Sequence, residues 1–68
     1  MQTKNRIVTI YLPNGTQAIF TTKDVNDSTY QVVDTIECDV DSVNVAWKED
    51  GKVQGESYVR MPYTLEMF

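Results

Sequence analysis

The chain has 68 residues, a formal net charge of −4, a single cysteine at position 38 and no histidine. This length allows one domain with one small core, near the size below which hydrophobic cores become marginal. One cysteine excludes an intrachain disulfide, and the lack of histidine excludes a Cys/His metal cluster. The lone thiol and the lack of a secretory signal pattern favour a cytoplasmic protein. No apolar run approaches the roughly 20 residues that cross a bilayer.

The negative charge is concentrated in residues 34–56. This segment carries seven carboxylates against two lysines, a net charge of −5, whereas residues 1–33 carry a net charge of +1. Direct binding to nucleic acid requires clustered Lys and Arg side chains, and binding to an anionic membrane surface requires them too. We therefore expect neither nucleic acid nor a membrane as a direct partner, whereas a basic protein partner is compatible with the charge.

Taken in chain order, the sequence is typical of strands throughout. Five segments rich in β-branched and aromatic residues predict strands, at residues 7–12, 17–22, 30–40, 43–47 and 53–61. No long apolar stripe has helical spacing, and only residues 22–27 are compatible with one helical turn, capped by Thr21 or Thr22. Residues 1–68 are thus predicted to form a single all-β domain. We expect an antiparallel barrel or strongly coiled sheet of five to six strands, of SH3-like or oligonucleotide-binding-barrel size, with at most one short helical turn.

Two glycine-containing turns, LPNGT and KEDGK, determine the predicted register of two hairpins. A two-residue loop in the second hairpin would set Val45 opposite Glu56, apolar against polar on one face. A three-residue loop with Gly15 or Gly51 in the left-handed conformation sets apolar residues opposite one another. We therefore expect positive φ at both glycines. The predicted closing pairs are Leu12–Thr16 and Lys48–Lys52.

The segment ECDVDS places three carboxylates two residues apart, at Glu37, Asp39 and Asp41. Along a strand they would share the outer face at spacings of roughly 6.8 Å, while Cys38 faces the core. The apolar phase changes from even to odd numbers at residues 41–42, so a turn or bulge is expected there. Asp34 would then face inward near a strand end, where an inward charge protects against edge pairing.

The spacing of the three carboxylates copies the first three ligands of a calcium-binding loop. Ser42 stands where that loop needs glycine, and Lys48 stands where it needs a bidentate glutamate. A straight strand also splays the carboxylates too far apart for one ion. We therefore predict no metal here and no cofactor elsewhere, because the three glycines are too scattered for a phosphate-binding loop. The acidic row is either a solvated face or a surface for a partner.

The residue types also disfavour catalysis. General-base chemistry at neutral pH most often uses histidine, which the chain lacks. Cys38 lies between Glu37 and Asp39, whose charges disfavour the thiolate that a nucleophile needs. We therefore expect a protein that is not an enzyme.

Four tyrosines are many for this length. Tyr11 and Tyr58 are predicted to face away from the apolar faces of their hairpins, and tyrosines beside carboxylates suit a peptide containing Arg or Pro. The expected function is a binding or regulatory module, an adaptor or inhibitor. It would dock a protein partner through Glu37, Asp39, Asp41, Tyr11 and Tyr58. The alternatives are an acidic mimic of nucleic acid that blocks a DNA- or RNA-binding protein, and a self-assembling structural subunit.

The final segment, MPYTLEMF, alternates apolar and polar residues after Pro62 and predicts one more strand. Burying each large apolar side chain there would contribute about 1.5–3 kcal/mol. The strand therefore either completes the fold within one chain or pairs with a second subunit. The residues expected to form such a homo-oligomer contact are Tyr63, Leu65, Met67 and Phe68.

Overall fold

The computed structural model describes residues 5–67, and within them the chain forms seven strands and no helix. The strands are β1 (Arg6–Tyr11), β2 (Gln17–Thr21), β3 (Gln31–Val32), β4 (Thr35–Cys38), β5 (Ser42–Glu49), β6 (Lys52–Val59) and β7 (Tyr63–Met67). Residues 22–27, the segment compatible with a helical turn, are irregular. The all-β prediction is confirmed.

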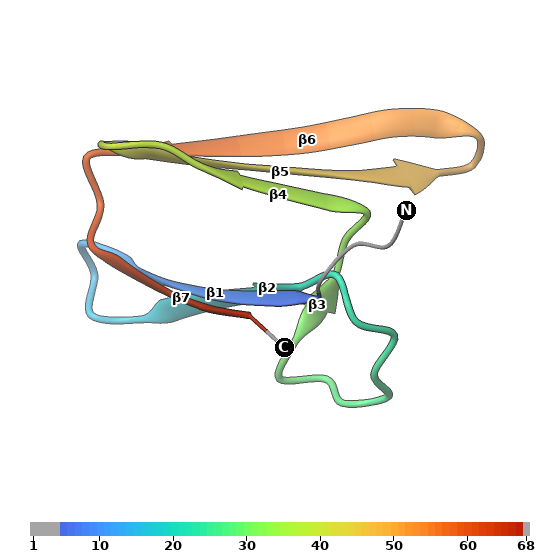
Figure 1. The fold of residues 1–68 in the computed structure, drawn as a ribbon, viewed down its shortest axis with the longest axis horizontal. Coiled ribbons are helices and arrows are strands. Elements are labelled where there is room, and N and C mark those ends of the chain that lie inside the picture. Colours follow the sequence, from blue (N-terminus) through green and yellow to red (C-terminus); the bar gives the residue numbers. More distant parts are fainter. Residues whose placement is uncertain (1–4, 68) are drawn as a thin grey trace.

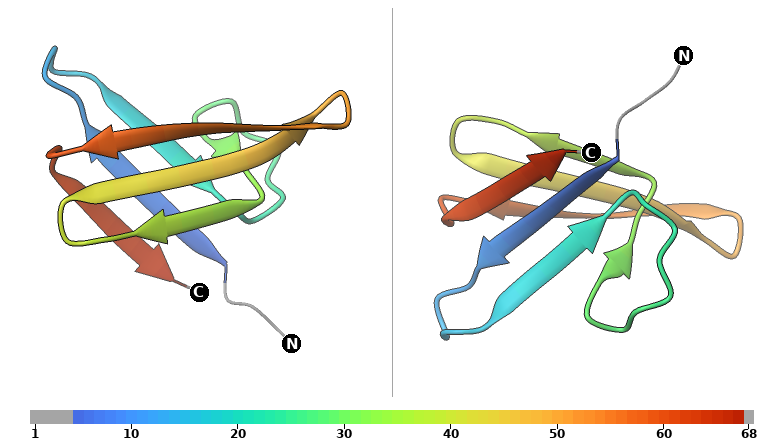
Figure 2. Two further views of the ribbon diagram at one scale, coloured as in Figure 1. Left: turned by 90° about the horizontal axis from the view of Figure 1, so that it is seen from above. Right: turned by 60° about the horizontal axis from the view of Figure 1, so that its bottom comes forward.

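The strands form two layers that pack face to face (Figure 1). One sheet has the order β3-β2-β1-β7 and the other has the order β4-β5-β6, and the strands of one layer cross those of the other (Figure 2). Neighbouring strands are antiparallel except β2 and β3, which are parallel. The predicted barrel of five to six strands is not confirmed, because residues 5–67 form two sheets that do not close on each other.

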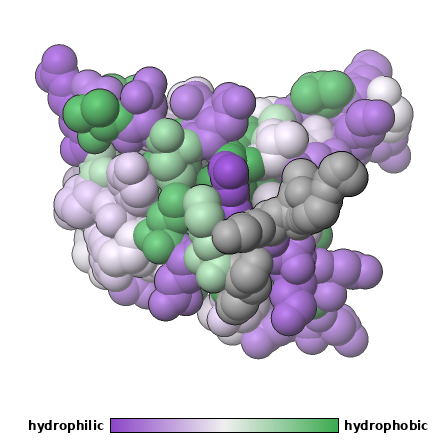
Figure 3. Space-filling model, in the orientation of Figure 1, coloured by the Kyte–Doolittle hydropathy of each residue, from purple (hydrophilic) through white to green (hydrophobic). Residues whose placement is uncertain are grey.

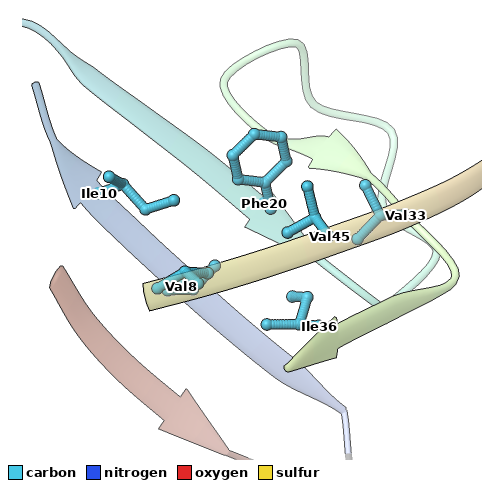
Figure 4. Packing of buried hydrophobic residues seen from close by; sticks show 7 residues of the cluster. Val8, Ile10, Phe20, Val33, Ile36 and Val45 are labelled. Carbon is cyan, nitrogen blue, oxygen red and sulfur yellow. The ribbon is translucent and has the colours of Figure 1, made fainter. Parts of the chain in front are cut away.

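The hydrophobic core lies between the two sheets. Alternate residues of a strand face the same side, so even-numbered residues of β1 and odd-numbered residues of β5 both point inward. Figure 4 shows their side chains converging from both layers. The buried apolar residues in the described chain are Val8, Ile10, Phe20, Val33, Ile36, Val43 and Val45. Thr21 is buried with them, and its hydroxyl donates a hydrogen bond to the Arg6 carbonyl at 2.9 Å.

The first hairpin has the predicted register. Val8 lies opposite Phe20, and the Leu12 amide donates to the Thr16 carbonyl at 2.9 Å. Gly15 has φ of +86° and donates its N–H to the Leu12 carbonyl at 3.1 Å. The three-residue loop is therefore confirmed.

The second hairpin has a different register from the one predicted. Gly51 has positive φ, +77°, as expected, but Asp50 also has positive φ, +54°. Two successive left-handed residues form a two-residue turn whose twist matches that of the flanking strands. The hairpin therefore closes on the pair Glu49–Lys52, and the predicted Lys48–Lys52 pair is wrong.

The shifted register sets Val45 opposite Glu56 and Val43 opposite Tyr58. The prediction failed because it assumed an apolar inner face along the whole of β6. In fact every residue of β6 except Tyr58 is exposed. The tip of the hairpin projects past the other sheet (Figures 1 and 2), so polar side chains on its inner face remain in water.

Residues 30–40, predicted as one strand, form the short strands β3 and β4 in different sheets. The chain crosses between the sheets at Val33 and Asp34. The Val33 amide donates to the Thr21 carbonyl, and the Asp34 amide donates to the Ala46 carbonyl, both at 2.8 Å. Val33 is buried and Asp34 is exposed, so the prediction that Asp34 faces inward is wrong. The crossing changes which face of the chain points to the core.

The predicted final strand is present as β7, which pairs antiparallel with β1 in the same chain. Leu65 lies opposite Val8 and Tyr63 lies opposite Ile10, and both pack against the core. Met67 is exposed, and Phe68 lies outside the described residues. In residues 5–67 no helix has the length and hydropathy that a membrane span requires.

Candidate partner-binding surface

The carboxylates predicted to bind a partner lie where β4 ends and β5 begins. The Asp39 amide donates to the Ser42 carbonyl at 2.7 Å, and the Asp39 carboxylate accepts a hydrogen bond from the Val40 amide at 2.8 Å. The predicted change of direction is therefore confirmed as a tight turn, which lies at Val40 and Asp41, one residue before the predicted position. We call Glu37, Asp39, Val40 and Asp41 the acidic turn.

The connection that follows β6 and the first residue of β7 hold the backbone of the acidic turn through hydrogen bonds. The Arg60 amide donates to the Asp41 carbonyl at 2.7 Å, and the Tyr63 hydroxyl donates to the Asp39 carbonyl at 3.0 Å. These contacts satisfy main-chain carbonyls and leave the side chains of the turn directed to solvent. Tyr63 is the tyrosine beside the carboxylates, a contact that the sequence pattern did not predict.

All four side chains of the acidic turn are exposed, and Val40 is 96% exposed. Figure 3 shows hydrophobic atoms among hydrophilic ones at the end of the upper layer, where β4 and β5 meet in Figure 1. In the described part of the chain, the Glu37 and Asp41 carboxylates have no hydrogen-bond or ion-pair partner. The turn therefore presents one exposed apolar side chain between Asp39 and Asp41 in the sequence, and the Glu37 and Asp41 carboxylates are free to pair.

The structure does not bring the two predicted tyrosines to the carboxylates. Tyr11 lies on the outer face of the four-stranded sheet, because its neighbour Ile10 points to the core. Tyr58 faces inward, with its ring centroid 5.8 Å from that of Phe20. The prediction that Tyr58 faces away from the core was wrong, because it depended on the wrong register of the second hairpin.

Burial, reinforced by hydrogen bonding, keeps the Tyr58 phenol neutral. Its hydroxyl donates to the Glu56 carboxylate at 3.0 Å. Burial, the hydrogen bond to Glu56 and the negative charge of Glu56 together raise the pKa of Tyr58 to about 12, with burial the largest cause. Tyr58 is therefore a neutral, packed residue at physiological pH rather than part of an exposed aromatic groove.

Beside the acidic turn, an open hollow of about 360 Å³ is lined by Arg6, Glu37, Cys38, Asp39 and Asn44. Cys38 is half-buried and packs against the core, as predicted. Burial raises the pKa of the Cys38 thiol, and the positive charge of Arg6 partly opposes that shift. A thiol with a raised pKa is mostly protonated at neutral pH, and the thiolate is the reactive form. The site therefore offers charge and shape rather than a nucleophile.

The described residues contain no group of three or more His, Cys, Asp or Glu side chains placed to hold a metal ion. The sequence predicted that Glu37, Asp39 and Asp41 lie along a straight strand, but Asp39 and Asp41 lie at a turn. The turn still does not bring the three carboxylates together around one point. The chemistry that the acidic turn offers is ion pairing and hydrogen bonding with cationic groups.

Comparison of the chain with protein-family models, with curated proteins and with solved structures gives no match in any of the three.

Proposed function

We propose that this protein is a non-catalytic binding module, an adaptor or inhibitor, that docks a protein partner through its acidic turn. The observation that supports this proposal is Val40, a 96% exposed valine held at the tip of a turn between exposed carboxylates. Protein interfaces commonly combine an apolar centre that becomes fully buried with a polar rim that remains hydrated. The acidic turn has this arrangement on a small scale, and backbone hydrogen bonds hold it before binding.

The complementary partner surface is a small apolar pocket whose rim carries Arg or Lys. Val40 would enter the pocket, and Glu37, Asp39 and Asp41 would pair with the rim. Opposite charges at a rim increase the association rate and make it sensitive to salt. Tyr11 and Tyr58 lie on other surfaces, so the proposal rests on the acidic turn. A single thiol suits a reducing compartment, and we propose the cytoplasm as the location of this binding.

Mimicry of nucleic acid is the weaker alternative. Duplex DNA carries about one charge per 1.7 Å of axis, so a mimic needs an extended row of carboxylates. The acidic turn confines its carboxylates to the end of one sheet and places a valine among them. An apolar pocket on a protein fits this pattern better than a groove built for phosphates.

The test is capture of a partner from a lysate of the cells that produce the protein, followed by measurement of the dissociation constant (Kd). The variant Glu37→Lys/Asp41→Lys changes two carboxylates that have no side-chain partner, so we expect normal thermal stability and loss of the captured protein. The matched control Asp24→Lys/Asp34→Lys makes the same change in net charge at two exposed positions away from the turn. Equal capture by both variants would contradict the proposal.

A second variant separates the apolar centre from the charge. Val40→Ala removes apolar area from the tip of the turn and should weaken binding of the purified partner by about tenfold, which corresponds to ~1.4 kcal/mol. Val32→Ala is the control, because Val32 is also an exposed valine, 43% exposed, and lies on β3 of the other sheet. A Kd that responds to neither substitution excludes Val40 from the interface.

A further inference from the structure

Strand β6 forms one edge of the three-stranded sheet and is eight residues long. In an antiparallel hairpin closed by Glu49–Lys52, alternate residues of β6 exchange main-chain hydrogen bonds with β5. The remaining residues direct their N–H and C=O groups away from the sheet. These outward-directed residues are Val53, Gly55, Ser57 and Val59. Within residues 5–67 no strand pairs with this edge.

The other edges of the two sheets are shorter, and one is obstructed. The outward-directed Ile36 carbonyl of β4 already accepts a hydrogen bond from the Arg6 guanidinium at 2.6 Å. Strand β3 has two residues and strand β7 has five. Natural proteins protect edges with prolines, bulges or charges. Strand β6 has no proline or bulge, and its one central charge is Glu56, which lies outside the outward-directed row. Among the described strands, β6 therefore offers the longest open edge for pairing.

The outward-directed residues of β6 are also self-complementary when two copies of the strand are placed antiparallel. Their side chains lie on the outer face of the sheet and carry no charge. Val53 and Val59, at the two ends of the row, are 71% and 54% exposed, and between them are the small residues Gly55 and Ser57. An antiparallel copy would set valine opposite valine at both ends and small residues opposite each other in the middle. A two-fold interface requires such self-complementarity.

We propose that two copies of this chain associate by antiparallel pairing of their β6 strands, which joins two three-stranded sheets into one continuous sheet. Val53 lies opposite Val59 of the second copy, and Gly55 lies opposite Ser57 of the second copy. In this register each outward-directed residue exchanges main-chain hydrogen bonds with a residue of the second copy. The inference is independent of docking through the acidic turn and goes beyond it.

The same register makes a specific prediction about Glu56. This residue lies at the centre of the pairing, opposite Glu56 of the second copy, in a pair whose Cα atoms are about 4.5 Å apart. Like charges directly opposite each other destabilise a sheet. The carboxylate already accepts the Tyr58 hydroxyl, and glutamine retains an acceptor for that bond. Glu56→Gln should therefore strengthen the dimer without disturbing the fold, which non-specific hydrophobic association would not do.

The experiment is sedimentation equilibrium of the full-length chain over a range of concentrations, with Kd of the dimer as the readout. Glu56→Gln should tighten Kd by about fivefold, which corresponds to ~1 kcal/mol. Val53→Lys introduces a charge that blocks edge pairing and should weaken Kd at least tenfold, roughly the effect of ~1.4 kcal/mol. The matched controls are Glu66→Gln on β7 and Val40→Lys on the acidic turn, and both should retain the wild-type Kd.

Three results would overturn the proposal. The first is that the wild-type chain and the Glu56→Gln variant are both monomeric at millimolar concentration. In that case the β6 edge would be a binding site for an extended segment of another protein and not for a second copy. Another is equal tightening by Glu66→Gln, and the third is an unchanged Kd in Val53→Lys. Glu37→Lys/Asp41→Lys should leave the dimer intact, so failure of the docking proposal and failure of this one are distinguishable.

Discussion

Gly15 and Gly51 show how single residues determine the two hairpin turns. Both have positive φ, a region in which other L-residues lose about 1–2 kcal/mol. Apart from the glycine itself and its two chain neighbours, no heavy atom of the described chain lies within 4 Å of a Cβ placed at either glycine. A substitution there is therefore resisted by backbone conformation alone and not by steric contact with neighbours.

Gly51→Ala should destabilise the domain by about 1 kcal/mol, because alanine disfavours the left-handed conformation. Gly51→Asn should destabilise it less, because asparagine adopts that conformation more readily. The measurement is the free energy of unfolding by urea, with Gly15→Ala as a parallel case. Equal stability of the alanine and asparagine variants would contradict the assignment of the turn.

Tyr58 should make stability depend on pH in the alkaline range. Its pKa in the folded protein is about 12 against an ordinary value of 10.0, so the folded state binds the phenolic proton more tightly than the unfolded chain does. The associated stabilisation is fully present below pH 10 and is lost as pH rises through about 12. Ultraviolet titration of the folded protein should show a late phase of tyrosine ionisation near pH 12. Tyr58→Phe should remove that late phase and reduce the alkaline slope of stability, and a late phase that persists in Tyr58→Phe would contradict its assignment to Tyr58.

At the scale of elements, the edges of the two sheets differ in how well they are protected against pairing with another strand. The sequence suggested that an inward Asp34 protects a strand end, but the structure assigns protection to Arg6, whose guanidinium binds the Ile36 carbonyl across the two sheets. Arg6 belongs to β1, so one side chain links the four-stranded sheet to β4. The edge of β6 has no comparable contact among residues 5–67.

Strand β7 should contribute to stability through Leu65 rather than through Met67. Leu65 is half-buried and packs against the core, whereas Met67 is 52% exposed. Leu65→Ala should therefore destabilise the domain by about 1–2 kcal/mol, below the 2–5 kcal/mol of a fully buried site. Met67→Ala should change stability by less than about 0.5 kcal/mol. Deleting residues 63–68 removes the whole strand and should unfold the monomer, as judged by circular dichroism. A truncated chain of normal stability would contradict the pairing of β7 with β1.

At the scale of the whole molecule, two crossings of the chain tie the sheets together. One is at Val33 and Asp34, whose amides bond to carbonyls in different sheets, and the other runs from β6 to β7 through Arg60. Because the core side chains come from both sheets, neither sheet buries its inner face without the other. The domain should therefore unfold as one cooperative unit.

Hydrogen exchange tests this cooperativity. The Val33 and Asp34 amides should exchange only through global unfolding, with protection equal to the free energy of unfolding. In dilute protein, the Val53 and Ser57 amides should exchange far faster, because they point away from the sheet. Rapid exchange at Val33 and Asp34 would mean that the crossing opens locally and that the sheets separate before the domain unfolds.

The sequence predicts some of this fold well, for physical reasons that are local. The first hairpin follows from Pro13, Asn14 and Gly15, which together favour one loop length. The register of the second hairpin was mispredicted because apolar residues were expected to lie opposite one another along its whole length. The tip of this hairpin extends beyond the other sheet, so its inner face can carry polar residues. The break at Val33 depends on carbonyls of Thr21 and Ala46, which are distant in sequence.

In the candidate site, too, the sequence predicts some features and not others. The sequence predicts the grouping of Glu37, Asp39 and Asp41, because these residues are neighbours along the chain. It predicts that Tyr11 faces outward, but it does not predict which tyrosine lies beside the carboxylates, because that depends on registers and crossings elsewhere in the fold. Tyr63 was expected in the final strand and as a homo-oligomer contact. In the structure β7 pairs with β1, and the Tyr63 hydroxyl donates to the Asp39 carbonyl of the acidic turn.

The pairing of β1 with β7 has a mechanical consequence. Arg6 lies opposite Met67, so the beginning of β1 and the end of β7 are adjacent, and the strands run antiparallel from there. Tension applied at these two points acts across the ladder, so its hydrogen bonds are loaded one pair at a time rather than together. In a single-molecule pulling measurement the domain should therefore yield at low force by peeling of β7. It would resist far more strongly if held at Arg6 and at Tyr63, because that geometry loads the whole ladder in shear.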